Sequence, residues 1–479
     1  MPLIQTDRFA DKTNVNKAFF QSCADKIKQK ILNSIPNTQN KTLYYVSQNG
    51  DDANTGTDKA HPWKSLEKVN STPLCENDMV LFEAGQKWRG ILKTQKNVSY
   101  SHYGVGEPPI ICGSARNYAD PDLWCETDMP CVYRCCAELQ NPGIMAFDHD
   151  DRLGNYDACY GSLLFERDNY DLDEKGLQKD LQFFWNAKTK ETYLYSEFGN
   201  PGTRFQSIEI GEAPTVVWLN DGCLIDGLRV RYGGALGMAC GSVRDVTIIN
   251  CVCDWIGGSK LGNNATFGNA IQIYGNAINC RIDHNWCYQC YDTAMTVQCT
   301  GVSKTDAIME NVSMSDNLVE YCYWGIEYWN QPSAEYARAF RNVKVDRNFI
   351  RFTGMGWGSA FRAEQYKGFP YLYEQTAALC CFGMIEEAEN VSVNENVVEL
   401  SHNGAIVRMD YYGGECFTYY NNVFAQYWKD KMLLFHKNRH DCDENLEQSL
   451  NQYSNFCNNQ IWMIEEGETD YKIKGEIRK

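Results

Sequence analysis

Val312-Ser313-Met314-Ser315-Asp316-Asn317 is one of five copies of a short phrase in the second half of this chain. Each copy has a small or branched residue, a spacer, a second such residue, two polar positions and then Asn. The other copies span 280–285, 343–348, 391–396 and 416–421. The steps between the final Asn residues are 32, 31, 48 and 25 residues. A period in this range is typical of a solenoid, whose repeats stack on their neighbours.

The alternation inside each phrase predicts a strand, because side chains at i and i+2 share one face. An Asn at each strand end is suited to a left-handed turn position and to amide hydrogen bonds with the next coil. The predicted fold class is therefore all-β, a right-handed parallel β-helix. Such a fold exposes a sheet on which a long polymer can lie.

Charge and composition limit the partners of this 479-residue chain. Its formal net charge of −17 repels phosphate backbones, so we expect no nucleic-acid partner. No apolar stretch approaches the roughly 20 residues of a membrane span, so we expect no membrane partner. Aromatic residues make up 13% of the chain and charged residues 22%, which favours a neutral carbohydrate as substrate. The oligomeric state stays open.

The chain contains 22 cysteines. Residues 1–37 are polar and lack the apolar core of a signal peptide, so we expect a cytoplasmic protein with free thiols, unless an export signal has been removed. Four cysteines fall at strand or turn positions of the repeats, which predicts burial inside the solenoid: Cys251, Cys280, Cys322 and Cys416. Cys287 and Cys290 form a lone CxxC pair without a partner pair, so we expect no metal site there.

Five regions follow from this pattern. Residues 14–35 carry apolar side chains at helical spacing and end before Pro36, so region 1–40 is expected to be a helical cap or a helix docked on the solenoid. The remaining regions are the first coils at 41–115, a β-rich insertion at 116–205, the core with the active groove at 206–435, and a C-terminal cap or tail at 436–479. Within the insertion, 183–196 predicts a hairpin.

The N-terminal coil carries a family resemblance. It reads Tyr44-Tyr45-Val46-Ser47, then a Gly/Asn/Asp turn, Pro62-Trp63-Lys64-Ser65-Leu66, Asp78-Met79-Val80-Leu81-Phe82 and Trp88-Arg89-Gly90. This wording resembles the pectate-lyase-like right-handed β-helix proteins found among carbohydrate-active enzymes, and the insertion resembles that of some glycoside-hydrolysing relatives. The resemblance implies the fold. Because that superfamily includes both hydrolases and lyases, it does not imply one chemistry.

Candidate site residues come from a second strand after each Asn turn, at 270–274, 294–298, 325–329, 360–364 and 406–410. In this alignment two outward columns run across the coils. The first contains Gln272, Thr296, Glu327, Arg362 and Arg408, and the second contains Tyr274, Gln298, Trp329, Glu364 and Asp410. Three carboxylates on one sheet face are what a sugar-cleaving groove requires.

Glycoside cleavage uses one carboxylic acid and one carboxylate, at separations that differ between retaining and inverting enzymes. With strands about 4.8 Å apart, Glu364 and Asp410 are expected as direct neighbours and Glu327 as a diagonal one. Both separations fit, so the stereochemical outcome is open. The predicted catalytic residues are Glu327, Glu364 and Asp410. The predicted substrate-binding residues are Asp292, Gln298, Trp324, Trp329, Arg362, Arg408 and Tyr411.

The sequence thus predicts a glycoside hydrolase acting on a neutral or mildly substituted oligosaccharide or polysaccharide, without a cofactor or metal. A polysaccharide lyase is the first alternative, with Arg362 or Arg408 as base and Ca²⁺ on the carboxylates. A non-catalytic glycan-binding solenoid is the second, in which the Arg-x-acid pairs are solvated ion pairs. The paired-Asp and Ser-His-Gly signatures of polygalacturonases are absent. The sugar, the linkage and endo or exo action stay open.

Overall fold

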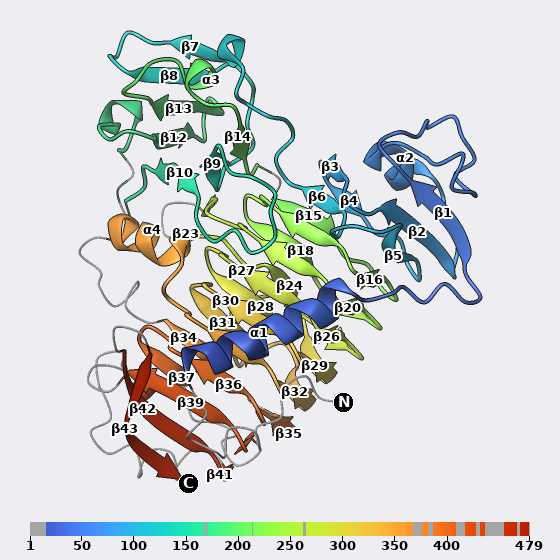
Figure 1. The fold of residues 1–479 in the computed structure, drawn as a ribbon, viewed down its shortest axis with the longest axis vertical. Coiled ribbons are helices and arrows are strands. Elements are labelled where there is room, and N and C mark those ends of the chain that lie inside the picture. Colours follow the sequence, from blue (N-terminus) through green and yellow to red (C-terminus); the bar gives the residue numbers. More distant parts are fainter. Residues whose placement is uncertain are drawn as a thin grey trace.

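The computed structural model describes residues 16–166, 169, 171–212, 214–261, 265–366, 376–381, 387–408, 417–427, 432–435, 455–466 and 470–478. Short strands stack along one axis in three long sheets, and a smaller β unit stands at one end (Figure 1). Within the three sheets the neighbouring strands are parallel, apart from the last pair. The predicted parallel β-helix is confirmed.

We name the three sheets by what lies on them. The asparagine sheet carries the repeated phrase and consists of β1 (Thr42–Val46), β2 (Asp78–Glu83), β5 (Ser99–Tyr103), β16 (Leu224–Asp226), β20 (Thr247–Ile249), β26 (Arg281–Asp283), β29 (Ala307–Ser313), β32 (Arg338–Lys344), β35 (Ala388–Ser392), β38 (Phe417–Tyr420) and β41 (Asn455–Cys457), with β19 (Val243–Arg244) and β25 (Ala277–Ile278) at its side.

The helix-covered sheet packs under an N-terminal helix. It consists of β3 (Lys87–Arg89), β6 (Ile110–Cys112), β17 (Arg229–Arg231), β21 (Val252–Asp254), β27 (Trp286–Tyr288), β30 (Leu318–Glu320), β33 (Phe349–Arg351), β36 (Val397–Glu399), β39 (Val423–Tyr427), β42 (Gln460–Glu466) and the antiparallel β43 (Tyr471–Arg478).

The groove sheet carries the candidate site. It consists of β4 (Leu92–Lys93), β15 (Thr215–Trp218), β18 (Leu236–Cys240), β24 (Ile271–Tyr274), β28 (Thr293–Cys299), β31 (Trp324–Asn330), β34 (Ala377–Cys381), β37 (Gly404–Arg408) and β40 (Met432–Phe435).

A buried amide ladder joins the coils. Its members are Asn285, Asn317, Asn348, Asn396, Asn422 and Asn459, all fully buried. The Asn317 carboxamide oxygen accepts from the Asn285 backbone N–H at 2.8 Å, and its Nδ2 donates to the Ile282 carbonyl at 2.9 Å. The turn between two sheets therefore leaves its backbone groups satisfied by the coil above or below.

Two details of the Asn prediction were wrong. The last ladder member is Asn422 rather than Asn421, because Val391 pairs with Phe417 and shifts the final phrase by one residue. The left-handed position belongs to the residue before each ladder amide, for example His284 with φ 57° and Asn421 with φ 56°. The ladder amides follow the left-handed turn and use their side chains for stacking.

A second amide ladder, which the sequence analysis missed, lies on the exposed side of the asparagine sheet. Asn279, Asn311, Asn342 and Asn390 all have positive φ. The Asn311 side chain donates to Asn279 at 3.0 Å, and Asn390 donates to Asn342 at 2.8 Å. Asn311, Asn342 and Asn390 lie within β29, β32 and β35, and Asn279 lies between β25 and β26. At these left-handed positions Asn is tolerated better than branched residues.

The interior of the solenoid is filled by aliphatic side chains and thiols. Cys251, Cys280 and Cys322 are buried there, as predicted, while Cys416 lies outside the described residues. Cys287 and Cys290 are also buried core members. Cys287 lies in β27 and Cys290 shortly after it, and both act as small apolar residues in the core.

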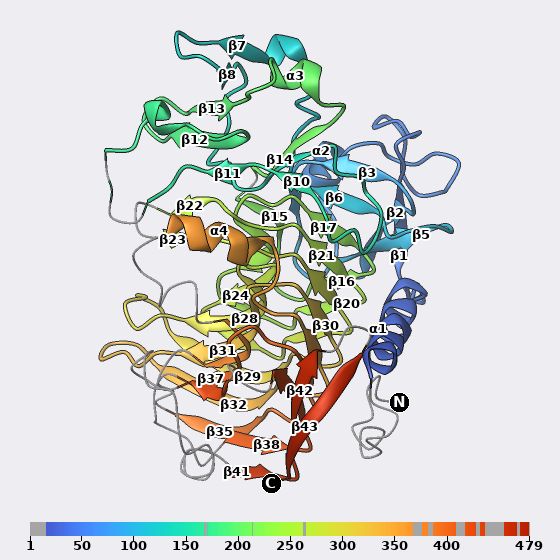
Figure 2. The ribbon, with the colours of Figure 1, turned by 60° about the vertical axis from the view of Figure 1, so that its left-hand side comes forward.

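Helix α1 (Lys17–Leu32) confirms the predicted N-terminal helix. Its buried residues, Phe20, Ala24, Ile27 and Ile31, pack against the helix-covered sheet, and the helix runs along the side of the solenoid (Figure 2). Lys28 forms an ion pair of 2.9 Å with Glu320 on β30. Within the described residues, no helix has the length and apolar character that crossing a membrane requires.

The insertion forms its own five-stranded sheet from β7 (Trp124–Glu126), β8 (Val132–Cys135), β11 (Ser162–Leu163), β12 (Gln182–Asn186) and β13 (Glu191–Tyr195). Strands β12 and β13 are antiparallel, which confirms the predicted hairpin. Smaller elements are α2 (Leu66–Ser71), α3 (Pro201–Arg204), β9 (Met145–Phe147), β10 (Cys159–Tyr160), β14 (Ile208–Ile210), β22 (Lys260–Leu261) and β23 (Ala265–Thr266).

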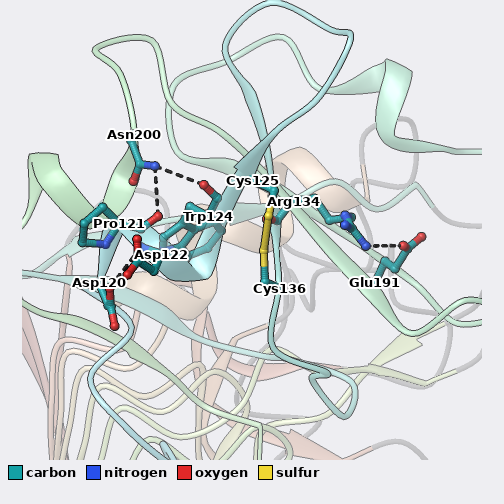
Figure 3. Close-up of a disulfide and its surroundings, with 9 residues drawn as sticks. All are labelled: Asp120, Pro121, Asp122, Trp124, Cys125, Arg134, Cys136, Glu191 and Asn200. Atoms are coloured by element: carbon teal, nitrogen blue, oxygen red, sulfur yellow. Dashed lines mark hydrogen bonds and ion pairs between the residues drawn. A yellow bond between two sulfur atoms is a disulfide. The ribbon is translucent and has the colours of Figure 1, made fainter.

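A disulfide joins Cys125 and Cys136 in this insertion (Figure 3). Because β7 and β8 pair antiparallel with Cys125 opposite Arg134, the two thiols lie at one end of the hairpin. The structure therefore differs from the expectation of free thiols at this pair. Cys251, Cys280, Cys287 and Cys322 are free thiols.

Candidate active site

The outward face of the groove sheet aligns two rows of polar side chains. Gln272, Thr296 and Glu327 are direct neighbours on β24, β28 and β31. Tyr274, Gln298 and Trp329 form the second row on the same three strands, also as predicted.

The next coil departs from the predicted columns. Residues 360–364 belong to helix α4 (Trp357–Gln365), and the strand of that coil is β34. Glu327 therefore pairs with Cys380, and Cys381 pairs with Arg408. The alternation at 360–364 was misleading because Ala, Arg and Glu are strong helix formers.

This register corrects the predicted positions of Glu364 and Arg408. Glu364 lies in α4, outside the groove sheet, so it cannot be the strand neighbour of Asp410. Arg408 ends β37, one position away from the Glu327 row. Asp410 and Tyr411 lie outside the described residues.

Helix α4 carries Arg362 to the start of β28. Figure 2 shows the helix between the insertion and the groove sheet. The Arg362 guanidinium forms an ion pair of 2.7 Å with Asp292. It lies over two aromatic rings, 4.6 Å from the centre of Tyr291 and 4.0 Å from that of Tyr323. The planar guanidinium is suited to this combination of ion pair and ring stacking.

The backbone on both sides of Asp292 is fixed by hydrogen bonds. Asp292 donates its N–H to the Gly268 carbonyl at 3.2 Å and accepts from the Trp324 N–H at 3.1 Å. The following N–H, of Thr293, donates to the Asn269 side chain at 3.1 Å. The Asp292 side chain remains 24% exposed, so the carboxylate is held in place yet accessible from outside.

Glu327 has a different environment. Its side chain is almost fully buried, and burial together with the nearby Asp292 charge raises its pKa to about 8. The polar side chains of Thr293, Trp329 and Thr296 face the carboxyl group and oppose part of this rise in pKa. Glu327 is therefore protonated at neutral pH.

Asp292 differs from Glu327 in having a positively charged partner. Burial raises its pKa, and the positive charge of Arg362 opposes that rise. Arg362 itself keeps its charge, because its own pKa lies above the ordinary value despite its burial. The arrangement favours the proton on Glu327 and the negative charge on Asp292, which is the division that acid–base chemistry requires.

Aromatic and thiol groups lie near the Glu327 and Asp292 carboxyl groups. Trp324 packs with Tyr323, Cys380 and Val407 in a small buried cluster. The pKa of the Cys380 thiol is raised by burial and by Glu327 and Asp292, so this thiol stays neutral beside the carboxyl pair. The position of Cys380 was missed, because only the tertiary register brings β34 next to β31.

Other buried charges of the solenoid have structural partners. Arg229 and Asp254 form a fully buried ion pair of 2.9 Å, and Arg351 bridges Glu320 and Glu399 at 3.1 and 2.5 Å. These pairs lie on the helix-covered sheet. In the part of the chain that the structure describes, no three His, Cys, Asp or Glu side chains are grouped to hold a metal ion.

The sequence similarity of this chain to a curated protein is local. No protein-family model matches the chain. Over 92 residues, or 18% of the chain, the sequence is 50% identical to a lacto-N-biosidase from Bifidobacterium longum subsp. longum, and this stretch spans 5% of that protein.

Solved structures match the chain at low similarity. XylC in complex with xylose has 13% sequence identity and a TM-score of 0.44, with coverage of 82% of this chain and 70% of that one. The GH136 lacto-N-biosidase from Eubacterium ramulus has 13% identity and a TM-score of 0.38, with coverage of 83% and 66%.

Proposed function

We propose that this protein is a glycoside hydrolase acting on a neutral or mildly substituted oligosaccharide, with Glu327 as general acid and Asp292 as its ionised partner. The unequal environment of these two carboxyl groups carries the proposal. Burial raises the pKa of Glu327 to about 8, whereas Arg362 holds Asp292 in an ion pair. The local identity to a lacto-N-biosidase supports the same reaction class.

In the proposed reaction Glu327 donates its proton to the glycosidic oxygen as the bond breaks. Asp292 stabilises the positive charge that develops at the anomeric carbon, and it either attacks that carbon or activates a water. Arg362 acts as a positioning residue, because it fixes the Asp292 carboxylate and favours its charged form. Trp324 and Trp329 lie on the same strand as the acid, and both are largely buried beside it.

The test is a screen of the purified protein on chromogenic glycosides and on neutral and uronate oligosaccharides, including lacto-N-biosides, with and without a chelator. Active substrates are then repeated with Glu327→Gln and Asp292→Asn. We expect chelator-resistant hydrolysis that falls by about 10²- to 10⁴-fold in each variant. Asp226→Asn is the matched control, because Asp226 is a buried carboxyl group with a raised pKa on the asparagine sheet.

Two results contradict the proposal. Unsaturated products that absorb in the ultraviolet and vanish with the chelator indicate a polysaccharide lyase. Binding that both carboxyl variants retain, with no turnover by the parent protein, indicates a glycan-binding solenoid. NMR of the first-formed anomer distinguishes the two roles of Asp292, since a nucleophile retains the configuration and a base inverts it.

A further inference from the structure

A single row of outward side chains continues from Glu327 toward the N-terminal end of the groove sheet. Strand register places Glu327 beside Thr296, Thr296 beside Gln272, Gln272 beside Ala239 and Ala239 beside Trp218. We call these five residues the outer row. Figure 1 shows its strands, β15, β18, β24, β28 and β31, one after another along the solenoid.

Trp218 stands out in this row by its exposure. Its side chain is 44% exposed, although it follows the buried Val216 and Val217 on β15. A large indole left in water at the end of a strand has an apolar face without a protein partner on that side. The neighbour beyond it, Lys93 on β4, is also exposed, so the row ends at open surface.

Polar groups lie between Trp218 and the acid. The Gln272 carboxamide oxygen accepts from Asn269 at 2.6 Å and from Gln298 at 3.2 Å. Its NH₂ group makes no hydrogen bond to any described residue, and the side chain is half-buried. Ala239 and Thr296, on either side of Gln272, are almost fully buried. Gln272 is therefore the member between Trp218 and Glu327 that reaches the surface, where it offers an oriented donor suited to a hydroxyl.

The spacing of the row matches a carbohydrate chain. Four strand steps separate Trp218 from Glu327, or about 19 Å at the usual spacing between strands. One unit of an extended glycan is about as long as one strand step. A chain lying along the row thus places one sugar per strand, with the fourth unit from the acid at the indole.

Resting on the proposed function, we propose that the outer row binds an extended neutral oligosaccharide whose distal sugar, about four units from the cleaved bond, stacks on Trp218. The enzyme then selects substrates by length. Gln272 contributes a hydrogen bond in the middle, and Trp218 contributes a ring face at the end.

The experiment measures binding in the Glu327→Gln variant, while the activity screen described above measures turnover by the parent protein. Affinities of neutral β-linked oligosaccharides of two to six units, in glucose, xylose, galactose and N-acetylglucosamine series, are measured by calorimetry with Glu327→Gln. We expect Kd to fall about tenfold between three and five units in the series that binds. In Glu327→Gln/Trp218→Ala the Kd for five units rises about three- to tenfold, and the Kd for two units is unchanged.

Tyr420→Ala is the matched control, because Tyr420 is a 40% exposed aromatic residue on the asparagine sheet. Affinity that does not depend on length, or a Trp218→Ala effect that is equal at all lengths, overturns the inference. Absence of binding in every series also overturns it. Length-dependent binding by a parent protein that cleaves nothing contradicts the proposed hydrolysis and supports the outer row, so the two failures are distinguishable.

Discussion

The guanidinium of Arg362 and the carboxylate of Asp292 form an ion pair of 2.7 Å, although they come from a helix and from the start of a strand in different coils. Through this pair α4 supplies the positive charge that lies beside the proposed catalytic carboxylate Asp292. The negative charge that Arg362 favours on Asp292 is also one reason that the Glu327 pKa is high.

Arg362→Met is expected to lower kcat by about 10²-fold or more, because Asp292 loses the charge that keeps it ionised. The acid limb of the kcat/KM profile should move to higher pH, since the Asp292 pKa rises. Arg362→Lys should restore part of both effects. The measurement is a pH series of initial rates on the substrate found in the screen.

Arg347→Met is the control for this series, since Arg347 forms an ion pair of 2.8 Å with Asp316 away from the site. An unchanged acid limb in Arg362→Met, together with wild-type kcat, would show that Asp292 does not depend on this arginine.

Activity should fall on the alkaline side as Glu327 loses its proton. With its pKa at about 8, kcat/KM is expected to decline through pH 8. Thr296→Val removes one of the polar groups that lower this pKa, so its alkaline limb should lie at higher pH than that of the parent. A limb that stays in place, or that shifts downward, would argue against Glu327 as the acid.

The pH dependence of the unfolding free energy should also report the raised pKa of Glu327. Because the folded-state pKa of Glu327 is raised, its contribution is fully present below the unfolded pKa and is lost as pH rises through about 8. Glu327→Gln should therefore be more stable than the parent at pH 9 by about 1–4 kcal/mol, and nearly equal at pH 4. Denaturant titrations at both pH values measure this difference.

Glu389→Gln on the exposed face of β35 is the control and should give equal stability at both pH values. A Glu327→Gln protein that gains nothing between pH 4 and pH 9 contradicts the raised pKa.

Removing an amide from the buried ladder should lower the unfolding free energy far more than removing one from the exposed ladder. Asn317→Ala removes hydrogen bonds to Ile282, Asn285 and Asn348 and leaves buried backbone groups without partners. We expect a loss of about 2–4 kcal/mol in unfolding free energy. Asn311→Ala, in the exposed ladder, is the matched change and should cost about 1 kcal/mol or less.

Equal losses in Asn317→Ala and Asn311→Ala would show that burial does not set the strength of the ladders. Urea titrations of both variants give the comparison.

Much of the solenoid was predictable, because its repeats are local. A phrase that ends in Asn specifies a strand and a turn within a few residues, and stacking repeats it at each coil. For this reason β26 lies within its phrase, and Gln272, Thr296 and Glu327 align as expected. The strands β29, β32 and β35 begin earlier than predicted and end at the second residue of their phrases. The one-residue error at Asn421 arose because Asn422 follows it directly, so either Asn could be the end of the final phrase.

The sequence by itself determined the strand and turn pattern, the solenoid class and Glu327 as an outward carboxyl group, since each depends on short-range alternation. Only the tertiary structure decided its partner. The segment after β33 forms α4 rather than a strand, so Cys380 takes the position beside Glu327 and Arg362 reaches Asp292 instead. Alternation cannot reveal this, because five residues are too few to distinguish a helix from a strand, and the contacts of Arg362 with Tyr291 and Tyr323 form only in the folded chain.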